Sequence, residues 1–208
     1  ALLTLVNGDF KNAVQQLLKS NEEDRKTGDT ENLSNGLNQL AELLIEMDRL
    51  EEAEPPLAEV ETLTGNEMRS THLMTHLLRA RIACKKADFI ETKRHIQEAH
   101  SLLGQFPYPL EQIQIIFEEA KLAGAEKRWE DSDRYYQQVI KFLKKSGIQF
   151  HLAKVETEWA DLYIARGTPE DTAKAKALLQ EALRFFQAKK LDYYTGQTSQ
   201  RLQTLISK

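Results

Sequence analysis

Hydrophobic and polar residues alternate along this chain with helical spacing. One apolar stripe, with the i, i+3, i+4, i+7, i+8 pattern of a helix face, comprises Leu37, Leu40, Ala41, Leu44 and Ile45. A polar turn over residues 46–49 separates it from a second stripe, formed by Leu50, Ala53, Leu57 and Val60. The pattern predicts two helices joined by a short turn.

The arrangement repeats. A small residue followed four positions later by a bulky one occurs five times, at intervals of 40, 39, 40 and 43 residues. The pairs are Ala13/Leu17, Ala53/Leu57, Thr92/Ile96, Ser132/Tyr136 and Ala175/Leu179. A fixed period of this length is typical of stacked helical hairpins. We therefore predict an all-α, right-handed α-solenoid of about five helix-turn-helix repeats, forming a single domain over residues 1–208.

Glycines mark the boundaries between the predicted hairpins. They follow the second helix of a pair, where a left-handed C-cap favours glycine, at Gly28, Gly65, Gly104 and Gly147. The third unit is predicted over residues 67–103 and the fourth over 110–145. In the fifth, the small and bulky pair arrives three residues late, and we assign this delay to an insertion at residues 168–170 that lengthens the turn. A competing register, with Trp159 at the aromatic position of its unit, needs no insertion.

The two ends of the chain differ. Residues 1–6 are apolar, lie in register with the repeat and lack a starting Met, so we expect the stub of a helix and the C-terminal part of a longer protein. A final amphipathic stripe comprises Leu191, Tyr194, Leu202, Leu205 and Ile206. This stripe predicts a C-terminal capping helix, which covers the edge of the core.

The spacing of Leu40, Ala41, Ala53 and Leu57 resembles the tetratricopeptide repeat, in which small and large residues at set positions lock paired helices. The period near 40 is longer than the roughly 34 residues of that family, and is similar to repeats in the sensor arms of bacterial signal-transducing ATPases and transcription activators. The resemblance implies a non-catalytic interaction or sensor scaffold, which would be the repeat arm of a larger regulatory protein.

In tetratricopeptide arrays the first helix of each pair lines the concave face. The resemblance implies that partner-binding residues are Asn35, Asn38, Glu42, Met74, Leu77, Arg81, Gln114, Phe117, Lys121, Lys154, Thr157 and Asp161. Among them, Arg81 and Lys121 beside Phe117 could hold an acidic or carboxylate-ended peptide. A receptor domain for such a peptide is therefore the first alternative function.

Composition narrows the range of partners. The formal net charge is −4 and the pI is about 5.8, which argues against nucleic acid as a partner because phosphate binding needs a concentrated basic surface. No apolar run approaches the length of a membrane span. Cys84 is the single cysteine, so we expect a reducing, cytoplasmic location. The expected partner is a protein or peptide, and a homo-oligomer is possible.

Few residues are candidates for metal binding or catalysis. His72 and His76 have the i, i+4 spacing that can hold zinc, but no third ligand is evident and the Glu of a metalloprotease motif is missing. His95 and His100 are five apart and should not share a helix face. We predict no catalytic residue, no metal and no cofactor. A metal-binding or enzymatic domain is the second alternative.

Overall fold

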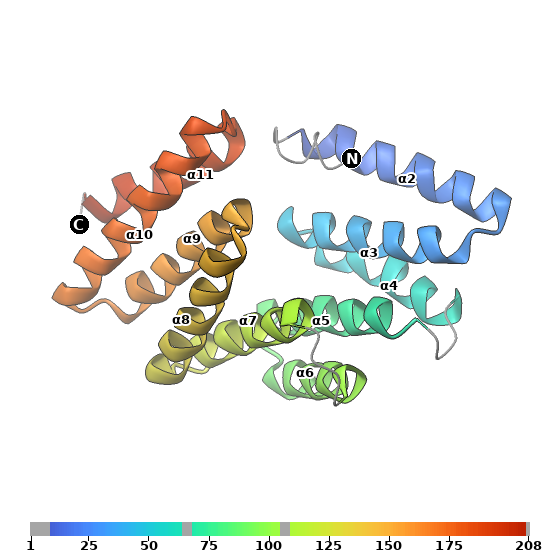
Figure 1. Ribbon diagram of the computed structural model, residues 1–208, viewed down its shortest axis with the longest axis horizontal. Coiled ribbons are helices and arrows are strands. Elements are labelled where there is room, and N and C mark those ends of the chain that lie inside the picture. Colours follow the sequence, from blue (N-terminus) through green and yellow to red (C-terminus); the bar gives the residue numbers. More distant parts are fainter. Residues whose placement is uncertain (1–8, 64–67, 105–108, 207–208) are drawn as a thin grey trace. The chain divides into compact units, whose positions relative to one another are not determined.

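The computed structural model describes residues 9–63, 68–104 and 109–206, and within them the protein is all-α, with ten helices and no strand (Figure 1). The described helices form two compact units, residues 9–118 and 119–206, with the boundary inside α7. The single domain over residues 1–208 stays a prediction.

Consecutive helices pack against one another within each unit. The first unit contains α2 (Phe10–Thr27), α3 (Thr30–Glu46), α4 (Leu50–Leu63), α5 (Arg69–Lys85), α6 (Phe89–Leu103) and the start of α7 (Pro109–Ala125). The second unit contains the remainder of α7, α8 (Trp129–Ser146), α9 (Gln149–Arg166), α10 (Pro169–Ala188) and α11 (Asp192–Ile206).

The recurring small and bulky residues lie in α2, α4, α6, α8 and α10, the second helix of each predicted hairpin. All five small residues are at most 1% exposed, and all five bulky residues are at most 6% exposed. Small side chains at a helix crossing let two backbones approach closely, and the bulky residue one turn later fills the space beside them. The predicted helices and their buried positions are confirmed.

The turn inside each hairpin also recurs. Its left-handed residue has φ of 60° at Asp48, 59° at Ala87, 60° at Lys127 and 73° at Gly167. In the first three turns, the next N–H donates to the carbonyl five residues earlier at 2.8–2.9 Å, which closes the end of the first helix. Between hairpins, Gly28 and Gly147 have the predicted left-handed C-cap conformation. Gly104 has a φ of 62° but a ψ of −147°, so it is not left-handed, and Gly65 lies outside the described residues.

The delay in the fifth hairpin lies in a helix and not in the turn, so the predicted longer turn was wrong. α10 begins at Pro169, forty residues after α8 begins at Trp129. Thr168 is the N-cap, and its side chain and that of Asp171 form a reciprocal capping box. Proline is favoured at the first helical position, where no amide donor is needed. The extra residues therefore add a turn to the start of α10.

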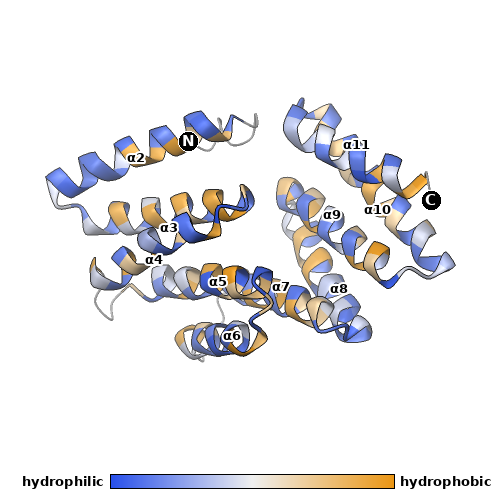
Figure 2. Ribbon diagram, turned by 180° about the vertical axis from the view of Figure 1, so that it is seen from behind, coloured by the Kyte–Doolittle hydropathy of each residue, from blue (hydrophilic) through white to orange (hydrophobic). Residues whose placement is uncertain are grey.

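Apolar residues from successive helices form continuous clusters. In the first unit, one cluster joins buried residues of α2, α3, α4 and α5, and Figure 2 shows α3 carrying hydrophobic residues along its length while α2 is largely hydrophilic. In the second unit, Leu202 and Leu205 of α11 pack on a cluster from α9 and α10. Ile206 was predicted on this apolar stripe but is 63% exposed, because it lies at the last turn of α11.

Two expectations concern the N-terminus and membrane-spanning segments. The expected helix stub at residues 1–6 lies outside the described residues. Over the described ranges, none of the helices combines the length and apolar character that crossing a bilayer requires.

One glycine inside a helix is needed for close approach. A Cβ at Gly36 of α3 would lie 2.1 Å from Oδ1 of Asn21 on α2. Asn21 is 1% exposed, and neither polar atom of its amide has a hydrogen-bond partner among the residues that the structure describes. The amide therefore occupies the space that an alanine side chain would need.

We expect Gly36→Ala to lower the free energy of unfolding by about 1 kcal/mol, because the methyl group overpacks this contact. In an Asn21→Ala background the same change should raise stability by about 0.5–1 kcal/mol, the ordinary gain of alanine over glycine in a helix. Urea unfolding of the four proteins measures both steps. An effect of the same sign in both backgrounds would contradict the contact.

Candidate functional site

Three of the predicted partner-binding residues are buried between helices. Asn38, Leu77 and Thr157 are at most 5% exposed. The Asn38 amide donates to the Thr71 carbonyl at 3.1 Å, and its oxygen accepts from the Thr75 hydroxyl at 3.0 Å. Asn38 thus ties α3 to α5, and these three residues serve packing rather than an open surface.

The predicted cation Arg81 on α5 is held between two carboxylates of the first unit. Its Nη2 lies 2.6 Å from Oε1 of Glu118 on α7, and its Nη1 lies 3.3 Å from Oε1 of Glu42 on α3. The Glu118 side chain is only 3% exposed, while that of Arg81 is 19% exposed. The guanidinium therefore neutralises a buried acid and links three first helices.

The second unit shows the same kind of pairing. Nζ of Lys121 lies 3.3 Å from Oε2 of Glu158, and Oδ2 of Asp161 lies 3.3 Å from Nη2 of Arg201. Burial raises the pKa of Asp161 to about 6, although Arg201 opposes this shift. We call the ion pairs of Arg81, Lys121 and Asp161 the first-helix ion pairs.

The predicted residue Lys154 lies beside aromatic rings. Its Nζ is 6.0 Å from the ring centroids of both Phe150 and Tyr194.

The other predicted residues are more accessible. Asn35 is exposed, and its side-chain oxygen accepts from the Thr71 hydroxyl at 3.4 Å. Met74, Gln114 and Phe117 are half-buried, and Met74 packs against the core of the first unit. All four belong to the first unit and are uncharged. Whether they contact a partner stays a prediction.

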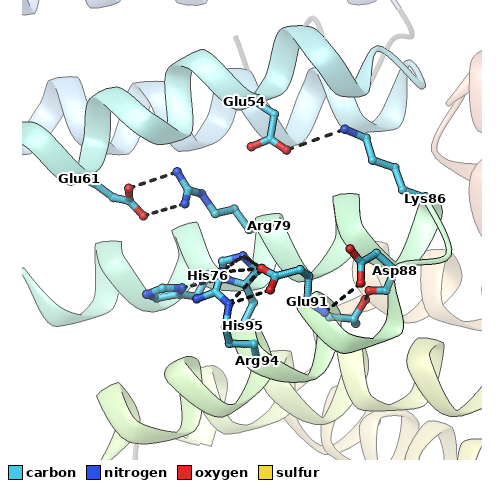
Figure 3. Close-up of polar contacts among 10 residues, drawn as sticks. Glu54, Glu61, His76, Arg79, Lys86, Asp88, Glu91, Arg94 and His95 are labelled. Carbon is cyan, nitrogen blue, oxygen red and sulfur yellow. Dashed lines mark hydrogen bonds and ion pairs between the residues drawn. The ribbon is translucent and has the colours of Figure 1, made fainter.

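A histidine pair that the sequence reasoning missed lies between α5 and α6. Nδ1 of His76 is 3.0 Å from Nδ1 of His95, and the two ring centroids are 5.3 Å apart (Figure 3). His95 is 6% exposed, and Nη2 of Arg94 lies 3.0 Å from its Nε2. Burial lowers the pKa of both imidazoles, that of His95 to about 4 with a further contribution from Arg94.

The hairpin geometry could have revealed this pair. Ala80 and Thr92 are the small residues where α5 crosses α6, and both are 1% exposed. The two helices are antiparallel, so the residue one turn before Ala80 on α5 lies near the residue one turn after Thr92 on α6. These two residues are His76 and His95. In the sequence, His76 was compared only with His72 on the same helix, and the spacing within one helix does not indicate a residue of the neighbouring helix.

The second unit contains an aromatic and acidic cluster between α8 and α9. Oδ1 of Asp133 accepts a hydrogen bond from Nε1 of Trp159 at 2.9 Å and another from the Tyr163 hydroxyl. The Tyr136 ring stacks on Trp159, with centroids 6.1 Å apart. Burial, together with the bond to Asp133, raises the pKa of Tyr163. Because Asp133 is on α8 and both donors are on α9, these hydrogen bonds join the two helices.

Nowhere in the described ranges do three or more His, Cys, Asp or Glu side chains gather in a way that could hold a metal ion. Comparison with protein-family models finds no match, and comparison with curated proteins finds no match either.

Proposed function

We propose that the chain is a non-catalytic interaction module, a right-handed, tetratricopeptide-like α-solenoid that serves as the repeat arm of a larger regulatory or signalling protein. One observation carries the proposal. The same buried small and bulky residues and the same left-handed turn recur through successive hairpins at a step near forty residues. Stacked hairpins of this kind present extended surfaces that bind proteins or peptides.

The first-helix ion pairs favour a scaffold over a receptor for acidic peptides. Arg81 and Lys121 each contact a carboxylate of the chain itself. An acidic ligand would have to displace those carboxylates, and the desolvated Glu118 would then lose its counter-charge. The uncharged residues Asn35, Met74 and Gln114 favour a partner bound through polar and apolar contacts.

Site-directed photo-crosslinking tests whether the first helices of the hairpins form the partner-binding surface. A photoreactive amino acid is placed at Asn35 or Met74 on first helices, or at Ile90 on the second helix α6, and each protein is irradiated in extract of the organism of origin. Ile90 is 81% exposed, so accessibility alone would favour crosslinks from Ile90. We expect discrete protein adducts, severalfold stronger from Asn35 and Met74. Equal yields from all three positions, or adducts from Ile90 only, would contradict the proposal.

A further inference from the structure

The contact between the His76 and His95 rings has room for a single proton. Two nitrogens 3.0 Å apart form a hydrogen bond only if one carries hydrogen and the other accepts it. A guanidinium can only donate, so Nε2 of His95, which faces Arg94, is an acceptor. The proton of neutral His95 is therefore on Nδ1, and Nδ1 of His76 accepts it.

Neither ring has room for a second proton at these contacts. Protonation of His76 at Nδ1 would set two N–H groups against each other at 3.0 Å. Protonation of His95 at Nε2 would place a new N–H against the Arg94 guanidinium, also at 3.0 Å. Each imidazolium thus requires the pair, or the contact with Arg94, to separate.

Two of the three carboxylates near the pair have cationic partners. The charged groups near the pair are Glu61 on α4, Arg79 on α5, and Glu91, Arg94 and Glu98 on α6. Glu61 contacts Arg79 at 3.0 Å, and Glu91 contacts Arg94 at 2.7 Å (Figure 3). Oε2 of Glu91 is 3.8 Å from Nε2 of His95, beyond hydrogen-bond distance. Glu98 and Glu61 favour an imidazolium at His76, and Glu91 favours one at His95, but the burial of each ring outweighs these carboxylates.

We propose that His76 and His95 form a proton-operated latch, which holds α6 against α5 while both rings are neutral and makes this hairpin easier to open in acid. The direction follows from linkage, because the folded hairpin excludes a proton that the unfolded chain binds. The folded pKa of His95, about 4, is below its ordinary 6.5. The stabilisation is complete above pH 6.5 and is lost progressively as the pH falls toward 4. The latch does not depend on the proposed function.

Hydrogen exchange of the full chain tests the latch. After correction for the intrinsic pH dependence of exchange, the opening equilibrium of the α5 and α6 amides should increase roughly ten- to thirtyfold between pH 7.5 and 5. His95→Gln should remove most of this increase. The control His100→Gln, an exposed position on the same helix, should retain it. A wild-type hairpin that does not respond, or a His95→Gln protein with the full increase, would overturn the proposal.

A purely structural role would lower stability equally at both pH values, so the pH dependence separates the two explanations. Nitrogen NMR of the wild-type rings at pH 7.5 gives a test that needs no variant. We expect hydrogen on Nδ1 of His95 and on Nε2 of His76. Hydrogen on Nε2 of His95 would contradict the latch, because that tautomer cannot accept from Arg94.

Discussion

Arg81→Met is expected to lower the free energy of unfolding by about 3 kcal/mol, because it leaves a buried carboxylate without its guanidinium. Glu118 is 3% exposed and lies 2.6 Å from Nη2 of Arg81. The methionine side chain has similar length and apolar character, so it keeps much of the packing of the arginine stem. Urea unfolding followed by circular dichroism measures the loss.

Two further proteins show whether burial is the cause. The double variant Arg81→Met, Glu118→Leu should recover most of the loss, since it removes the stranded charge together with its partner. Arg25 and Glu59 form a pair at the same 2.6 Å, but their side chains are 40% and 32% exposed. Arg25→Met should therefore cost far less. A loss for Arg81→Met no greater than that for Arg25→Met would refute the structural role of this ion pair.

The sequence predicted the helices where buried residues of the same type recur at a fixed spacing. Ala53 lies at a helix crossing and Leu57 lies one turn later. Their sizes form a clear pattern because the close packing of the two helices restricts both side chains. The start of α10 was harder. A delay of three residues can lengthen a turn or extend a helix, and the decisive signals are Thr168 and Asp171, which cap the helix.

The candidate site was less predictable because contacts between helices determine it. The sequence indicated which charged residues lie on first helices, but not that Arg81 and Lys121 would each find a carboxylate on the following first helix. Both acids, Glu118 and Glu158, stand 37 residues after their partners. This recurrence was visible in the sequence. Its meaning depends on how each helix is rotated about its axis, which the apolar pattern defines only approximately.

The recurring small residues give the second large prediction. Ala53 on α4 and Ala175 on α10 are both 0% exposed. Leucine at either position adds three carbons at a closed helix crossing, so we expect each variant to lose about 2 kcal/mol or more. Ala58 and Ala177 lie on the same two helices and are exposed, so they serve as matched controls. Leucine at the control positions should change stability by less than about 0.5 kcal/mol.

One packing rule, repeated at a step near forty residues, builds the hairpins of both units. The most direct test is the free energy of unfolding of Ala53→Leu and Ala175→Leu, measured beside Ala58→Leu and Ala177→Leu under the same conditions. We expect a clear loss for the first two proteins and stability close to wild type for their controls. Equal stability within either matched pair would contradict it.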